Sequence, residues 1–163
     1  MNSDEDDDVV RPERLPIYRK GKEILDIVIK IGDLIPENDE YLAEIKACML
    51  CDAAQLTLKV AGAEDAGLYD LKMENAAIIR KAARDLMVQQ HSLDMFGFEY
   101  VEYYQIVREL IEEYRLLFID LVTGFDKWDY IIDRCGLFNP PGIGPFDKDT
   151  DDDIPFHGFN SEE

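Results

Sequence analysis

The sequence predicts an all-α protein: an up-down-up-down four-helix bundle with a short fifth helix near the C-terminus and irregular acidic tails. Three observations lead to this prediction. Apolar residues make up 47% of the 163 residues and recur at helical spacing through most of the chain. No stretch of useful length alternates as a strand does, and no hairpin dipeptide separates apolar segments. Connections of a few residues between the long segments require neighbouring helices to run antiparallel.

The first helix is predicted over residues 15–35, where Pro36 and the polar run after it end the pattern. Its apolar stripe consists of Tyr18, Ile24, Leu25, Val28, Ile31 and Ile35. Asp39 is the expected N-cap of the second helix, because its carboxylate can accept a hydrogen bond from a free backbone N–H. The buried face of that helix is predicted to contain Leu42, Ile45, Met49, Ala53, Leu56 and Val60, and residues 62–67 are expected to form a connection.

The third helix is predicted over residues 68–95 and is ended by Gly97. Its stripe consists of Leu68, Ile79, Ala82, Ala83, Leu86 and Leu93. The fourth helix is predicted over residues 99–122, with charged residues opposite a wide apolar face. That face consists of Tyr100, Tyr103, Tyr104, Val107, Leu110, Ile111, Tyr114, Leu117, Phe118, Leu121 and Val122. A short fifth helix is expected over residues 126–134.

The predicted organisation has three parts: an acidic tail at residues 1–12, a helical bundle at residues 13–135, and a Gly/Pro-rich acidic tail at residues 136–163. The chain carries 17 Lys and Arg against 36 Asp and Glu, a net charge of −19. More than half of this charge lies in the N-terminal tail and in the last residues of the C-terminal tail. The overall charge argues against nucleic-acid binding through a generally basic surface, because phosphate contacts need an excess of Lys and Arg.

The C-terminal tail differs from a simple disordered segment. Gly and Pro break any helix after Cys135. Apolar residues nevertheless recur among the acidic ones: Phe138, Ile143, Phe146, Ile154, Phe156 and Phe159. Disordered tails are usually poor in aromatic residues. We therefore expect these side chains to dock into grooves of the same bundle, of a second copy or of another protein; the alternative is a solvated tail.

Cys48 and Cys51 form a C-x-x-C pair inside the second predicted helix. A redox pair of this kind works at a helix N-terminus, and a zinc site needs two further ligands, for which only Cys135, His91 and His157 remain. The sequence therefore predicts buried structural thiols.

No cofactor, no metal and no enzymatic activity are expected. The run Asp147–Asp151 opens like a calcium loop, but it lacks the glycine at position six and the glutamate at position twelve, so a solvated acidic run is preferred. Glu109 and Glu112 form an E-x-x-E motif on a polar helix face without a convincing partner, which keeps a carboxylate-metal hydrolase as a weak alternative. No phosphate loop or nucleophile motif is present.

A few polar residues fall on or beside the apolar stripes. Asn75 and Gln90 share a stripe with Ile79 and Leu86, and Asp52 lies at the edge of another. Because buried polar groups need partners, a small polar network inside the bundle or at a subunit contact is expected. Such groups commonly set register or oligomeric state.

The order of several short motifs resembles a known family. Ile35-Pro36 ends the first helix, Val60-Ala61-Gly62 ends the second, and Leu68-Tyr69 precedes an Ala-rich helix with Arg80 and Arg84. This layout, over about residues 15–124, is similar to the small bacterial four-helix-bundle proteins encoded in 23S rRNA intervening sequences. It also resembles their relatives, the accessory variability determinants of diversity-generating retroelements. The resemblance implies a cyclic homo-oligomer, commonly a pentamer, without catalytic residues. For the retroelement branch it implies binding to a reverse transcriptase and to nucleic acid through basic surfaces.

Two local basic clusters are the candidate nucleic-acid patch. They consist of Arg19, Lys20 and Lys22 in the first helix and Arg80, Lys81 and Arg84 in the third. The preferred interpretation is that these residues pair with the surplus Asp and Glu of neighbouring helices, at a small gain for each pair.

A homo-oligomer is expected because the second helix has apolar residues outside its main stripe, at Leu50, Ala54 and Leu58. The N-terminus shows no signal-peptide pattern, and the densest apolar stretch, residues 24–31, is too short to span a membrane. The odd number of cysteines suits a reducing compartment, so a cytoplasmic location is expected. The preferred function is a non-enzymatic, homo-oligomeric accessory or scaffold protein that acts through protein–protein contacts.

Overall fold

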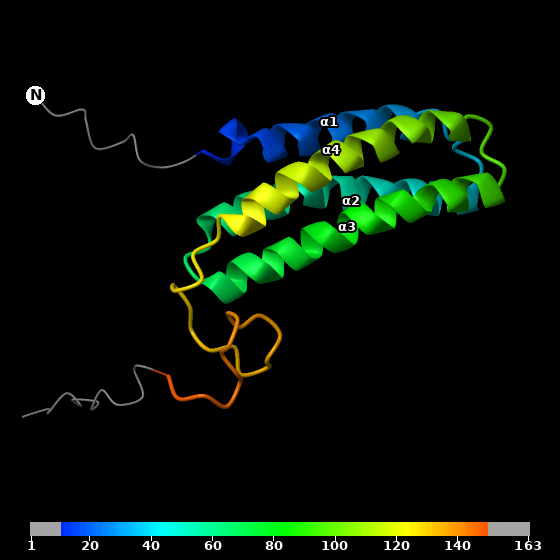
Figure 1. Ribbon diagram of the computed structural model, residues 1–163. Helices are drawn as coiled ribbons and strands as arrows, with labels where there is room; N and C mark the ends of the chain where they lie inside the picture. The colour runs from blue at the N-terminus through cyan, green and yellow to red at the C-terminus, as the bar shows by residue number, and fades with distance from the viewer. Residues whose placement is uncertain (1–10, 150–163) are drawn as a thin grey trace, which may run out of the picture.

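The computed structural model of the protein describes residues 11–149, and these residues form four long helices and no strand. The elements are α1 (Pro16–Gly32), α2 (Glu40–Asp65), α3 (Tyr69–Met95) and α4 (Tyr104–Thr123), with short 3-10 helices η1 (Pro12–Arg14) and η2 (Val101–Tyr103). The four long helices lie alongside one another (Figure 1). The prediction of an all-α protein with four long helices is confirmed for the part of the chain that the structure describes.

The helices surround a common core, and each packs on two neighbours. The α2–α3 contact is the most extensive, α1 packs on both α2 and α4, and the α3–α4 contact is the smallest of the four. In Figure 1 the α1–α2 and α3–α4 connections lie at one end of the molecule, and the α2–α3 connection lies at the other. α1 and α3 therefore occupy opposite corners of the arrangement.

The helix ends follow local chemistry. Pro16 occupies the first turn of α1, where its missing N–H would have no helical partner. The carboxylate of Asp39 accepts a hydrogen bond from the Leu42 N–H at 3.0 Å, so the predicted N-cap of α2 is confirmed. α2 continues beyond its predicted end to Asp65, with Gly62 inside the helix. Gly97 adopts a φ of 75° just after α3, which is the conformation that a helix stop requires.

The core contains most of the residues that the helical stripes predict. Its fully buried large side chains come from all four helices and include Ile24, Val28, Met49, Leu56, Val60, Ile79, Leu86, Leu93, Tyr104, Val107 and Tyr114. The two buried tyrosines also need hydrogen bonds. The Tyr104 hydroxyl donates to the Leu86 carbonyl, and the Tyr114 hydroxyl donates to the Leu56 carbonyl, each at 2.8 Å. The core is therefore apolar, and both of its buried tyrosine hydroxyls are paired.

The Leu56 carbonyl also lies against the backbone of α1. A Cβ on Gly21 would lie 2.7 Å from this oxygen, closer than side-chain carbons approach backbone atoms in real structures. Glycine at this position lets the two backbones meet.

The predicted fifth helix is wrong, because residues 126–134 form turns and irregular backbone. The Asp126 carboxylate accepts the Trp128 N–H at 2.9 Å, and the Asp133 carboxylate accepts the N–H groups of Cys135, Leu137 and Phe138 at 2.8–3.0 Å. These local bonds offer the backbone an alternative to a helix, which short acidic side chains commonly do.

Candidate interaction groove between α3 and α4

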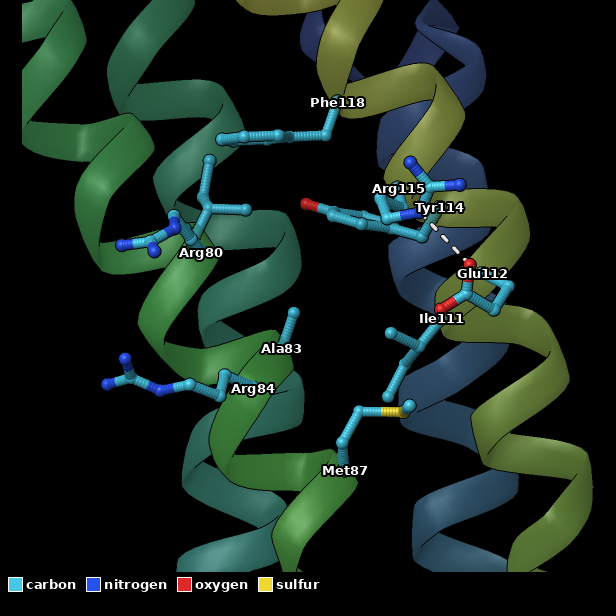
Figure 2. A pocket seen from close by; sticks show the side chains of 10 residues that line it. Arg80, Ala83, Arg84, Met87, Ile111, Glu112, Tyr114, Arg115 and Phe118 are labelled. Atoms are coloured by element: carbon cyan, nitrogen blue, oxygen red, sulfur yellow. Dashed lines mark hydrogen bonds and ion pairs between the residues drawn. The ribbon is translucent and has the colours of Figure 1, made fainter.

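A groove opens along the weakly packed side of the molecule, between α3 and α4 (Figure 2). Its volume is about 210 Å³. The lining residues are Ile79, Arg80, Ala83, Arg84 and Met87 from α3 and Ile111, Glu112, Tyr114, Arg115 and Phe118 from α4. The groove is therefore lined mainly by apolar side chains, with charged residues along its edges.

The floor of the groove follows from helical spacing on the two facing helices. Ile79, Ala83 and Met87 lie four residues apart on α3, so they form one row, and Ile111, Tyr114 and Phe118 form a matching row on α4. Ala83 is small and half-buried between larger neighbours, which leaves space opposite α4. Burial raises the pKa of Tyr114, so this phenol stays neutral at physiological pH.

Three arginines flank this apolar floor. Arg80 and Arg84 are exposed one turn apart on α3, and Figure 2 shows both guanidinium groups extending from α3 on the side away from α4. On α4, the Arg115 Nε donates to the Glu112 carboxylate at 3.0 Å. Arg84 Nε lies 3.8 Å from an Asp85 oxygen. Among the described residues, no carboxylate lies within ion-pair distance of Arg80. Exposed cationic groups therefore stand beside an apolar groove in a protein whose net charge is −19.

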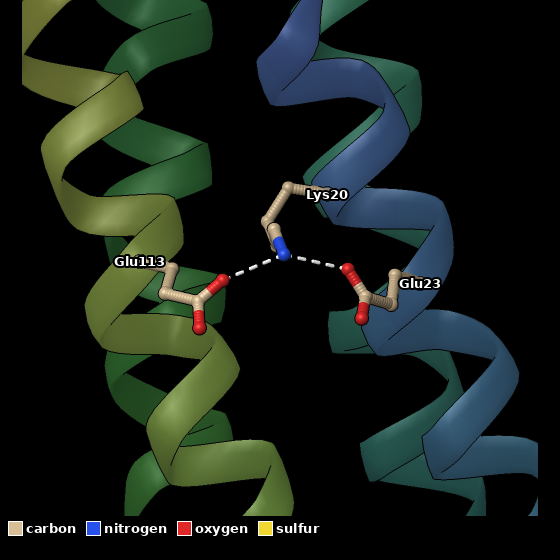
Figure 3. A network of polar contacts seen from close by, with 3 residues as sticks. All are labelled: Lys20, Glu23 and Glu113. Atoms are coloured by element: carbon tan, nitrogen blue, oxygen red, sulfur yellow. Dashed lines mark hydrogen bonds and ion pairs between the residues drawn. The ribbon is translucent and has the colours of Figure 1, made fainter.

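Two residues of the first basic cluster, Arg19 and Lys20, have partners within the same molecule, and Lys22 is exposed. Lys20 Nζ lies 2.6 Å from carboxylate oxygens of both Glu113 and Glu23, and so connects α1 to α4 (Figure 3). Hydrogen bonds to Glu113 and then to Glu23 raise the pKa of the Lys20 ammonium. Arg19 donates to the backbone oxygen of Glu13 at 3.3 Å. For Arg19 and Lys20, the structure favours local pairing.

The second basic cluster lies on α3, and Lys81 in it forms an ion pair with Asp85. Because α1 and α3 occupy opposite corners, the structure does not bring the two clusters together in one copy. Arg80 and Arg84, however, both line the groove. Sequence reasoning found these two arginines but missed the groove and Arg115.

The prediction of buried cysteines is wrong. Cys48, Cys51 and Cys135 are all exposed and carry free thiols. Cys48 and Cys51 lie beside the buried row that contains Met49 and Ala53, on the outer side of α2. They line a shallow pocket with Asp52, Lys81, Asp85, Val88 and Gln89. Burial, and then the nearby Asp85 carboxylate, raise the pKa of Asp52.

The expected polar network appears as separate local contacts. The Asn75 side chain donates to the Leu71 carbonyl of its own helix at 2.9 Å. Its oxygen lies against Gly62 of α2, where a Cβ would come within 2.8 Å. Gln90 lies apart from it, in a shallow polar pocket with His91, Asp94 and Arg108.

The structure describes three of the six predicted docking residues of the C-terminal tail. Phe138 and Ile143 are half-buried, and Phe146 is 96% exposed. Ile154, Phe156 and Phe159 lie outside the described residues. Trp128 also follows α4 in the sequence and is 88% exposed, although the sequence patterns did not point to it.

The carboxylates that could have held a metal have other partners. Glu109 accepts from Gln105 at 3.3 Å, and Glu112 pairs with Arg115. Within residues 11–149, no group of three or more His, Cys, Asp and Glu side chains is arranged to hold a metal ion. The calcium-like run continues past Asp149, beyond the described residues.

Comparisons with family models, with curated proteins and with solved structures give no match. The resemblance to the intervening-sequence and retroelement proteins therefore stays a prediction. Among the described helices, none combines the length and the apolar character needed to cross a bilayer.

Proposed function

We propose that this protein is a non-enzymatic scaffold or accessory protein, an up-down-up-down four-helix bundle whose α3–α4 groove binds an acidic, aromatic-containing protein segment. The observation that carries the proposal is the groove itself, with its apolar floor and the flanking Arg80, Arg84 and Arg115. Short connections at alternate ends of the molecule support the bundle topology.

The chemistry of the groove selects the kind of partner. An apolar groove between two helices suits an amphipathic segment that inserts large apolar side chains. Arginine is enriched at protein interfaces, where aromatic and arginine side chains often dominate the binding energy. Carboxylates on the partner would meet the arginines at the edge, which favours correct orientation and fast association more than affinity.

The proposal is tested with a fluorescein-labelled synthetic peptide that alternates glutamate with phenylalanine and leucine, followed by fluorescence anisotropy. We expect binding that is lost when the aromatic residues of the peptide are replaced by serine. Ala83→Trp, which fills the groove, should weaken binding at least tenfold, about 1.4 kcal/mol. Ala77→Trp is the matched control, because Ala77 is exposed on the same helix and does not line the groove. Equal binding to both variants would contradict the proposal.

Self-association is a second part of the proposed function. Leu58 on α2 is 62% exposed and Tyr41 is 65% exposed, whereas Leu50 and Ala54 are half-buried. Large exposed apolar side chains on one helix favour a contact with a second copy, and a cyclic arrangement such as a pentamer is the form that the resemblance suggests. Light scattering of the full chain at micromolar concentration should give an oligomeric mass; a monomeric mass would contradict this part.

A second candidate function is that of a retroelement accessory factor, which binds a reverse transcriptase and nucleic acid. Exposed Arg80 and Arg84 support it, since no carboxylate of the described residues lies within ion-pair distance of Arg80, and Arg84 has one contact of 3.8 Å with Asp85. It predicts salt-sensitive binding to a labelled oligonucleotide that is lost in Arg80→Glu/Arg84→Glu. Lys30→Glu/Lys127→Glu is the control with the same net charge, because both lysines are exposed and lie outside the two basic clusters. The absence of oligonucleotide binding at low salt would eliminate this candidate.

A further inference from the structure

We propose that residues 150–163 of this chain dock in the α3–α4 groove of the same molecule, so that the C-terminal segment competes with external partners for the groove. This inference rests on the proposed function of the groove. The proposed occupant is the C-terminal segment that follows Asp149, the last residue that the structure describes.

Charge complementarity is the first argument. Residues 150–163 contain Asp151, Asp152, Asp153, Glu162 and Glu163 and no Lys or Arg. The groove is bordered by Arg80, Arg84 and Arg115 and by one carboxylate, Glu112, which pairs with Arg115, while the protein as a whole is strongly acidic. A segment of this charge is repelled by most of the molecular surface, so a local concentration of arginines beside an apolar floor is a favourable place for it.

The apolar side chains of the segment match the groove in kind and size. Ile154, Phe156 and Phe159 are interspersed with the acidic residues. The groove volume of about 210 Å³ exceeds that of the engineered apolar cavity of about 150 Å³ that takes up benzene. One phenylalanine ring therefore fits between the α3 and α4 rows, and a second apolar side chain can cover the groove mouth.

The chain after α4 is held close to the start of α3. The Tyr69 N–H donates to the Asp129 carbonyl at 2.7 Å. Farther along, the Arg134 guanidinium donates to the carbonyls of Pro145 and Asp147 at 3.1 and 2.8 Å. These contacts keep the departure point of residues 150–163 near the N-terminal end of α3 (Figure 1).

The length of the segment is sufficient to reach the groove from there. Ala83 lies about 21 Å along α3 from Tyr69, at a rise of about 1.5 Å per residue. Residues 150–156 span up to about 23 Å when extended, and residues 150–159 up to about 33 Å, at about 3.3 Å per residue. Phe156 therefore has the length to reach the Ile79 end of the groove, about 15 Å along α3 from Tyr69, and Phe159 has the length to reach Ala83.

Photo-crosslinking in the full chain tests the position of the segment. Phe156 is replaced by p-benzoylphenylalanine, the sample is irradiated, and the products are analysed by gel and by mass spectrometry. We expect a product of monomer mass that joins position 156 to a residue at the near end of the groove, such as Ile79 or Phe118. Its yield should fall several-fold in Ala83→Trp and stay unchanged in Ala77→Trp. The same probe at the exposed Phe146 serves as a control for non-specific reaction.

Two outcomes of this experiment would overturn the inference. A groove crosslink found only in a product of dimer mass would assign the occupant to a second copy. A crosslink pattern that avoids the groove and does not respond to Ala83→Trp would remove the segment from the groove altogether.

A competition experiment separates this inference from the function on which it rests. The glutamate–phenylalanine–leucine peptide is titrated into the wild-type full chain and into Phe156→Ser/Phe159→Ser. We expect the variant to bind the peptide several-fold more tightly, because the competing side chains have been removed. Equal binding to both proteins would overturn the inference and leave the groove function standing. If neither protein binds the peptide, the proposed function fails as well.

Discussion

The two sides of α3 are built differently. Toward α2, the contact is the most extensive in the molecule, and small buried residues lie along it, such as Ala53, Ala63, Ala76 and Ala82. Toward α4, the contact is the smallest among neighbouring helices, and larger side chains such as Met87 and Phe118 border the groove. The side chains at a contact set the distance between packed helices. The α2 side of α3 is thus closely packed, whereas the α4 side leaves apolar surface uncovered.

The sharpest test of this comparison uses two adjacent residues of α3. Leu86 is fully buried in the core, whereas Met87 is half-buried at the groove. Leu86→Ala should lower the free energy of unfolding by about 2–5 kcal/mol, because it leaves a cavity in a close-packed core. Met87→Ala should cost less than half as much, since one side of Met87 already faces an open groove. Urea denaturation followed by circular dichroism measures both. Equal losses in the two variants would show that both sides of α3 contribute equally to the free energy of unfolding.

The next effect concerns a tight contact between α1 and α2, outside the groove. Gly21→Ala would place a Cβ 2.7 Å from the Leu56 carbonyl, so α1 and α2 must separate. We expect a loss of about 1–3 kcal/mol in the free energy of unfolding, as for overpacked cores. Gly67→Ala is the control, because a Cβ at Gly67 would contact nothing within 4 Å. A Gly21 variant as stable as the wild type would argue against a tight α1–α2 contact.

A smaller effect is expected where α1 meets α4. Lys20→Met removes the ion pairs with Glu23 and Glu113 and should cost about 0.2–1 kcal/mol at neutral pH. The pKa of Lys20 is higher in the folded protein than its ordinary value of 10.5. The stabilisation is therefore fully present below pH 10.5 and is lost as the pH rises through the folded pKa.

The pH dependence provides the measurement. Denaturation curves of wild type and Lys20→Met should differ at pH 7. They should converge as the pH rises through the pKa of Lys20 in the folded protein. A difference that persists unchanged in strongly alkaline solution would contradict the role of the ammonium charge.

The smallest effect is expected on the outer face of α2. Cys48→Ser and Cys51→Ser should each change the free energy of unfolding by no more than about 0.5 kcal/mol, because both thiols are exposed. In the native protein, both thiols should react with Ellman's reagent without a denaturant. Protection of either thiol until the protein unfolds would restore the interpretation of buried structural cysteines.

Local sequence patterns were sufficient to predict the four long helices and most of the core residues. Ile24, Val28 and Ile31 recur at helical spacing and are buried, and Asp39 has the side chain that an N-cap needs. The same reasoning failed over residues 126–134, where the Asp126 carboxylate accepts the Trp128 N–H and the backbone forms turns. It also failed at Cys48 and Cys51, because a residue at the edge of the buried row stays exposed unless a neighbouring helix covers it.

The sequence by itself determined the all-α class, the four long helices and the apolar face of each, because these depend on the spacing of residues within one segment. Only the tertiary structure decided that Arg80, Arg84 and Arg115 flank one groove, while Lys20 is engaged by Glu23 and Glu113. Residues on different helices meet according to how closely those helices pack. That distance depends on the fit of side chains across each contact, which no single segment encodes.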